Sequence, residues 1–154
     1  MKKAVKIIAI VLAAAFFAIQ FYRPDRTNPP IVEAETLEAT TQVPENVQKI
    51  LERSCNDCHS NKTVYPWYSN VAPLSWGLAD HIAEGRRELN FSAWGTYNNK
   101  RKRHKLDEIC EQITDGLMPH NQYLWIHRDA RLFEADKKIL CDWAETEEVK
   151  LPEA

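Results

Sequence analysis

The sequence predicts an all-α domain of modest size that follows a hydrophobic N-terminal helix. The chain has 154 residues and only four glycines, whereas an all-β domain of this length needs more of them in its tight turns. Apolar residues recur at helical spacing just before residue 55 and again over 106–117 and 132–143, which indicates amphipathic helices. With 20 Lys and Arg against 22 Asp and Glu, the chain is not a generally basic nucleic-acid binder.

The N-terminal segment, residues 1–22, is predicted to be a signal anchor that forms a single transmembrane helix. Three lysines precede an apolar run from Ile7 to Tyr22 that contains one polar residue. As a helix this run would be roughly 24 Å long, short of the ~30 Å hydrocarbon core, so Lys6 and Arg23 would have to reach the interface. The alternative is a cleaved signal peptide. In either case the remainder is expected on the outer side of a bacterial inner membrane, in the periplasm.

Composition divides the rest of the chain into three parts. Residues 23–43 mix Pro, Thr and Glu without helical periodicity and are predicted to be a flexible tether. The folded domain is expected over 44–146, and Pro44 suits the first turn of its first helix. The tail, 147–154, is acidic and is expected to fray.

The motif Cys55-Asn-Asp-Cys58-His59 carries the chemistry. CxxCH is the attachment pattern of c-type haem, whose vinyl groups form thioethers with the two thiols. On one helical turn Cys55 and Cys58 share a face, and His59 is then placed beside the iron as its proximal ligand. A zinc ribbon would need a second ligand pair, but Cys110 and Cys141 are isolated. A thioredoxin-like motif would need a βαβ setting. One covalently attached haem c is therefore predicted.

The second axial ligand of the iron is predicted to be Met118. A helix with an apolar stripe is expected to end at Gly116, and Pro119 then favours a stiff extended turn. Coordination by Met and His together raises the haem potential. A methionine that only fills a gap in the core is the alternative.

The four other histidines are rivals of Met118. His81 and His127 are candidates either as distal ligands or as hydrogen-bond partners of a haem propionate. His120 would bind only if its turn swung, and His104 is expected to be solvated within a basic run.

Aromatic residues soon after His59 are candidates for the walls of the haem site, where cofactor contact and core packing largely coincide. They are Tyr65, Trp67, Tyr68 and Trp76. Cys110 and Cys141 lie on the stripes of two helices and are predicted to form either a disulfide or two buried thiols. A terminal helix over 132–143 is expected to pack across the helix that leads into Cys55.

Several longer stretches are more specific than CxxCH. They are the run from Cys55 to Trp76 with its Tyr-Pro-Trp-Tyr-Ser, Glu84-Gly-Arg86, Leu89-Asn-Phe-Ser-Ala-Trp94, Met118-Pro followed by Tyr123 and His127, and the apolar segment ending Ile19-Gln-Phe21. Over about residues 5–145 the chain resembles the bacterial haem-binding-domain family of small c-type cytochromes. The resemblance implies a cytochrome-c-like helical fold around one covalent haem held by Cys55 and Cys58, with His59 on the iron. Met118 matches the family's Met-Pro, although His120 stands where a second proline is usual.

Together these features predict a membrane-anchored, mono-haem c-type cytochrome that carries one electron on the periplasmic side. Its expected partner is a redox protein of the respiratory chain, and neither nucleic-acid binding nor enzymatic activity is expected. With His59 and Met118 both on the iron, no axial position would be open to O₂ or peroxide. The alternative is a haem-based sensor or a peroxidase-like enzyme with an open or displaceable distal position.

Overall fold

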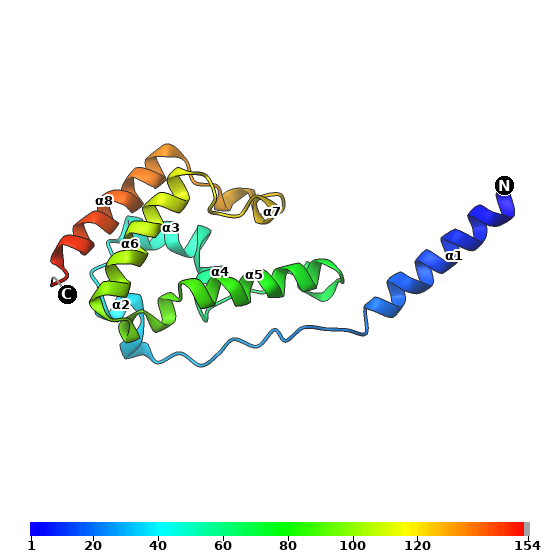
Figure 1. The fold of residues 1–154 in the computed structure, drawn as a ribbon, viewed down its shortest axis with the longest axis horizontal. Helices are drawn as coiled ribbons and strands as arrows, with labels where there is room; N and C mark the ends of the chain where they lie inside the picture. The colour runs from blue at the N-terminus through cyan, green and yellow to red at the C-terminus, as the bar shows by residue number, and fades with distance from the viewer. Residues whose placement is uncertain (153–154) are drawn as a thin grey trace.

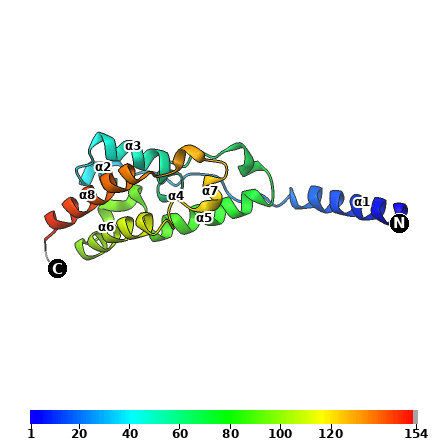
Figure 2. The ribbon, with the colours of Figure 1, turned by 90° about the horizontal axis from the view of Figure 1, so that it is seen from above.

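The computed structural model describes residues 1–152, and over that range it is helical with no strand, which confirms the predicted all-α class. The longer helices are α1 (Lys2–Ile19), α3 (Glu45–Ser54), α5 (Leu74–Glu88), α6 (Asn99–Thr114) and α8 (Glu134–Lys150). Short helical turns connect them: η1 (Glu33–Glu35), α2 (Leu37–Thr40), α4 (Asn56–His59), η2 (Trp67–Asn70), η3 (Phe91–Thr96), α7 (Asn121–Leu124) and η4 (Arg128–Ala130). Helices α6 and α8 lie together at the end of the domain far from α1, while α7 and the first turns of α5 lie nearer to it (Figures 1 and 2).

The core lies where α3, α6 and α8 meet. Helix α8 packs against both of the others, and Leu106 of α6 and Leu140 of α8 are fully buried in this contact. Burial of one such leucine side chain away from water contributes about 1.5–3 kcal/mol to the stability of the fold. The terminal helix therefore does pack across the helix that leads into Cys55, as its apolar stripe predicted.

A disulfide joins Cys110 of α6 to Cys141 of α8, with Cα atoms 5.0 Å apart. This separation lies within the usual range for a disulfide. Of the two alternatives left open by the sequence, the structure contains the crosslinked form.

Removing this crosslink should destabilise the domain. We expect the Cys110→Ser/Cys141→Ser variant to lose about 3–4 kcal/mol of unfolding free energy, because the bond constrains the long loop between them in the unfolded chain. Chemical denaturation with and without reductant measures this. Reductant should lower the stability of the wild type to that of the variant and leave the variant unchanged; equal stabilities without reductant would contradict the prediction.

Residues 23–43 are not the flexible tether that their composition predicted, because they lie along the domain and enter its core. Leu37 is only 1% exposed. The indole of Trp94 donates a hydrogen bond to the Thr41 hydroxyl at 2.9 Å, and the indole of Trp143 donates to the carbonyl of Gln42 at 3.0 Å. These contacts are made by single residues and not by one face of a long helix. The sequence of the segment therefore has no hydrophobic periodicity that would indicate them.

The C-terminal tail also differs from the expectation of a frayed segment from residue 147 onward. Helix α8 continues to Lys150, and Glu147 is buried and forms an ion pair with Lys150 at 2.6 Å. The remainder of that expectation, over residues 153–154, lies outside the described residues.

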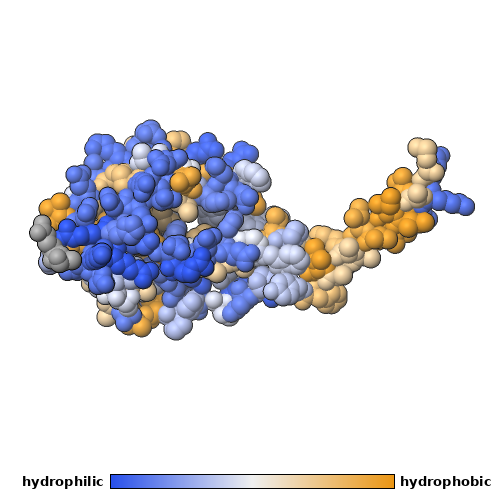
Figure 3. Space-filling view, viewed as in Figure 1, coloured by the Kyte–Doolittle hydropathy of each residue, from blue (hydrophilic) through white to orange (hydrophobic). Residues whose placement is uncertain are grey.

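Helix α1 projects from the domain with no buried side chain, and Figure 3 shows its apolar surface. Within residues 1–152 no helix is both long and apolar enough to cross a membrane, so the transmembrane helix expected over residues 1–22 is not supported. The end of α1 is nevertheless fixed to the domain. The Gln20 side chain donates to the carbonyl of Ala72 at 3.1 Å and accepts from its amide at 2.9 Å.

Candidate functional site

The CxxCH motif forms a separate helical turn. Helix α3 ends at Ser54, and Cys55 leaves the helical conformation with φ −127° and ψ −41°. The amides of Cys58 and His59 both donate to the carbonyl of Cys55, at 3.2 and 2.9 Å. The two cysteines therefore stand at the start and near the end of one turn, as their spacing predicted.

Both thiols of this turn are held in the neutral form. Burial raises the pKa of Cys55 to about 12, with the neighbouring Cys58 as a further cause. Burial likewise raises the pKa of Cys58 to about 11, helped by the charge of Asp57. Neither cysteine takes part in a disulfide, so both sulfur atoms are available for a cofactor.

His59 presents a defined tautomer. Its Nδ1 lies 3.1 Å from the carbonyl oxygen of Gly85 and 3.1 Å from that of Leu89. Because carbonyl oxygens only accept hydrogen bonds, Nδ1 carries the proton and Nε2 keeps its lone pair. Burial lowers the pKa of His59, which favours the neutral ring. A neutral imidazole whose Nδ1 donates to backbone carbonyls and whose Nε2 keeps its lone pair is the form that binds a metal.

Helix α5 is built to lie against the attachment turn. A Cβ atom at Gly85 would lie 2.7 Å from the carbonyl oxygen of Cys58, so only glycine permits this approach. The next residue, Arg86, donates to the carbonyl of Ser60 at 2.8 Å and to the hydroxyl of Thr63 at 2.8 Å. The Glu84-Gly-Arg86 stretch thus contributes a close contact and a polar link between α5 and the chain after His59.

Gly85→Ala should push α5 away from the turn that carries His59. Because the clash is with backbone, we expect a loss of about 1–3 kcal/mol in unfolding free energy and reduced haem incorporation, measured by denaturation and by haem absorbance per polypeptide. Gly77→Ala is the matched control on the same helix for the unfolding free energy only, because a Cβ there meets no atom within 4 Å apart from its chain neighbours and its own helix backbone, whereas Gly77 itself lines the cavity. If the two variants behaved alike, the close approach at Gly85 would not matter.

A cavity of about 460 Å³ opens beside the attachment turn, within the ~300–1,000 Å³ range of small-molecule and cofactor sites. It brings together five of the predicted site residues: Cys55, Cys58, His59, Tyr68 and Met118. The wall also includes residues that the prediction of the site did not include, among them Leu74, Leu78, Gln122, Tyr123, Trp125 and Ile126. Apolar and aromatic side chains dominate this set, as a flat hydrophobic cofactor requires.

The other three predicted aromatics do not line this cavity. Trp67 is 71% exposed and packs its edge against Tyr68. Trp76 packs against Tyr22 and donates its indole hydrogen to that residue's carbonyl at 3.0 Å. Tyr65 is half-buried and is not among the residues that line the cavity. Closeness in sequence to His59 suggested all four, but only Tyr68, in η2, lines the cavity, and Trp76 belongs to the first turn of α5.

Met118 is held by the end of α6. Gly116 adopts φ +71°, the left-handed conformation that favours glycine, and its amide donates to the carbonyl of Ile113. The amides of Leu117 and Met118 both donate to the carbonyl of Gln112, at 3.0 and 3.1 Å. This is the hydrogen-bond pattern of a Schellman C-cap, as the sequence suggested, and it fixes the backbone of Met118 although His120 replaces the second proline.

Two of the rival histidines share the cavity wall with Met118. His81, from α5, and His120, from the turn before α7, have ring centroids 4.7 Å apart, and both line the cavity. His127 does not line it and instead contacts Tyr68 and Tyr123. His104 is exposed on α6 beside Glu108, as expected.

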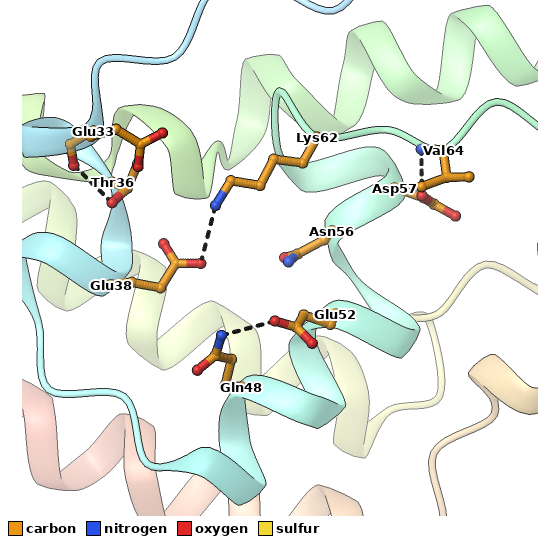
Figure 4. Close-up of a pocket in the computed structure, with 9 residues that line it drawn as sticks. All are labelled: Glu33, Thr36, Glu38, Gln48, Glu52, Asn56, Asp57, Lys62 and Val64. Atoms are coloured by element: carbon orange, nitrogen blue, oxygen red, sulfur yellow. Dashed lines mark hydrogen bonds and ion pairs between the residues drawn. The ribbon is translucent and has the colours of Figure 1, made fainter.

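A second cavity, of about 470 Å³, lies on another side of α4 (Figure 4). Its lining is polar and acidic: Glu33, Thr36, Glu38, Gln48, Glu52, Asn56, Asp57, Lys62 and Val64. It contains neither cysteine nor histidine. The sulfur and imidazole donors therefore assign the cofactor to the first cavity.

The fold and the first cavity define an all-helical haem-binding protein: two unpaired thiols, a neutral imidazole and a thioether line one largely apolar cavity, and these donors fit a haem. Comparison with known families agrees. The sequence model of the haem-binding domain family matches residues 14–146, and the chain belongs to this family. No curated protein and no solved structure matches the chain.

Proposed function

We propose that the protein is a mono-haem c-type cytochrome that carries one electron. Cys55 and Cys58 would hold the haem covalently through thioethers, with His59 and Met118 as the axial ligands of the iron. The observation that carries the proposal is the meeting of these four side chains at one cavity, where hydrogen bonds already fix the tautomer of His59. The bound haem would supply the redox-active iron.

The protein's own residues would keep that iron in one coordination state. The carbonyls of Gly85 and Leu89 orient the His59 ring, and the Gln112 carbonyl holds the backbone of Met118. Little rearrangement of the protein would then be needed on electron transfer, because the His59 ring and the Met118 backbone are already held. Six-coordinate iron of this kind favours electron transfer over reaction with O₂ or peroxide.

A potentiometric titration of the purified holo-protein tests this function. We expect a reversible one-electron transition with the same low-spin coordination before and after reduction. Addition of peroxide and an oxidisable dye to the oxidised protein is the control for enzymatic activity. Peroxide turnover, or a change of coordination on reduction, would contradict the carrier function.

A sensor or peroxidase-like function is the second candidate. It is favoured by the pair of imidazoles at the cavity, His81 and His120, and by the partial exposure of Met118 at 37%. In that case Met118 would leave the iron or never bind it. His81 and His120 would then act on an external ligand of the iron.

We further propose that the domain is exported and works near a membrane. The apolar segment over residues 7–22 supports export, and the Cys110–Cys141 disulfide supports an oxidising compartment. The electron partner would be a redox protein of the respiratory chain in that compartment. Protease added to intact spheroplasts should degrade the haem domain, whereas a domain that is protected until lysis would contradict export. Extraction of the membrane fraction at high pH separates an anchored chain from a released one.

A further inference from the structure

Two hydrogen bonds connect the chain after α6 to the chain around the cysteines. We call residues 117–127, which include Met118 and α7, the distal segment. The Tyr123 hydroxyl donates to Oδ2 of Asp57 at 2.7 Å, and Asp57 lies between the two cysteines of the motif. The Tyr68 hydroxyl is hydrogen-bonded to Nε2 of His127 at 2.8 Å. Each bond thus joins the distal segment to a residue that lines the opposite side of the cofactor cavity, Asp57 or Tyr68.

The two bonds act as one unit. The rings of Tyr123 and His127 are stacked, with centroids 4.1 Å apart and an angle of 4° between planes. The amide of His127 also donates to the carbonyl of Tyr123 at 3.0 Å. Moving either ring away from its partner would therefore move the other.

The groups in these bonds are suited to lasting contact. Burial raises the pKa of both Tyr123 and Tyr68, and for Tyr123 the hydrogen bond to Asp57 adds to this. Both hydroxyls therefore keep their protons. The other oxygen of Asp57 accepts from the amide of Val64 at 3.0 Å, so the acceptor itself is fixed.

Besides these two bonds, few contacts hold the distal segment over the cavity, chiefly the buried Pro119 and the contact of His120 with His81. Helix α7 is four residues long and contains no buried residue. Leu117 is 55% exposed and Trp125 is 75% exposed, so these two side chains contribute little packing. Its N-terminal end is bonded to the Gln112 carbonyl, whereas Tyr123 and His127 connect its second half to the opposite wall.

We propose that Asp57, Tyr68, Tyr123 and His127 form a clamp that keeps the distal segment closed, and thereby keeps Met118 on the iron. The four are positioning residues: they act on coordination through Met118 and do not bind iron themselves. This inference rests on the proposed function. It predicts that opening of the distal segment, and not the Met118 bond alone, sets how quickly an external ligand reaches the iron.

The test uses the reduced holo-protein and carbon monoxide as the probe. Tyr123→Phe removes the hydroxyl and keeps the aromatic ring that stacks on His127. We expect it to bind carbon monoxide about 10- to 100-fold faster than the wild type, since loss of a buried hydrogen bond of this kind shifts an opening equilibrium by that order. The oxidised variant should also lose part of the absorption band of the Met–iron bond.

Three further variants separate the clamp from general destabilisation. Thr41→Val is the matched control, because the Thr41 hydroxyl is also an internal hydrogen-bond partner, accepting from the Trp94 indole at 2.9 Å, but the residue lies outside the cavity. It should bind carbon monoxide at the wild-type rate. Asp57→Asn keeps an acceptor oxygen for Tyr123 and should stay near the wild type, whereas Asp57→Ala should match Tyr123→Phe.

The outcomes distinguish the clamp from the proposed function. If the wild type binds carbon monoxide slowly and Tyr123→Phe binds it equally slowly, the clamp is overturned and the carrier function still stands. Acceleration of carbon monoxide binding in Thr41→Val equal to that in Tyr123→Phe would also overturn it, since a loss of stability would then explain both. A wild type that binds carbon monoxide without delay would overturn the clamp and the carrier function together.

Discussion

Replacing Cys55 and Cys58 together with alanine is expected to abolish haem retention under denaturing conditions. The two thiols are the unpaired cysteines of the chain and stand on one turn at the cavity wall. No other side chain can therefore form a thioether bond to the haem. Haem staining of a denaturing gel, or the intact mass with and without acid–acetone extraction, measures the loss. The effect should be complete.

Variants at the other sulfur atoms control for damage to the fold. The Cys110→Ser/Cys141→Ser variant should retain its haem on the denaturing gel, because its cysteines belong to the disulfide between α6 and α8. Single replacement of Cys55 or Cys58 should leave one thioether and a shifted absorption maximum. Haem that survives denaturation in the Cys55→Ala/Cys58→Ala variant would disprove covalent attachment at these residues.

Met118→Ala should lower the reduction potential by on the order of 100 mV, because axial ligands set haem potentials over a wide range and a thioether stabilises the reduced iron. The oxidised protein should lose its Met–iron absorption band. Spectroelectrochemistry of the variant and the wild type measures both changes at once. The reduced variant should bind carbon monoxide readily.

Variants of the neighbouring histidines test whether the change belongs to Met118. His81→Ala and His120→Ala should keep the absorption band, although both side chains line the same cavity. If Met118→Ala left the oxidised spectrum unchanged and one of the histidine variants altered it, the distal ligand would be that histidine.

The parts of the fold that the sequence predicted well are those with a local physical cause. Gly116 marks the end of α6 because only a residue that tolerates positive φ completes the cap. The CxxCH turn follows from hydrogen bonds among its own residues. The terminal helix followed from an apolar stripe, and Leu140 is indeed fully buried.

The parts that were missed depend on contacts distant in sequence. Leu37 lies in a segment whose composition resembles a linker, and only the tertiary fold shows that it enters the core. The partner of Asp57 is Tyr123, 66 residues further along the chain. The aromatic residues after His59 gave no indication of direction, because Trp67 and Tyr68 are neighbours and yet one is exposed and the other buried.

The proposed carrier function depends most directly on one condition: side chains of this protein fill both axial positions of the iron. Addition of carbon monoxide to the reduced wild-type holo-protein at neutral pH, followed by its absorption spectrum, tests that condition in one step. We predict that the spectrum of the six-coordinate reduced wild type changes only slowly, while a parallel sample of Met118→Ala forms the carbon monoxide adduct at once. Rapid formation of the adduct by the wild type would show an open distal position and contradict the carrier function.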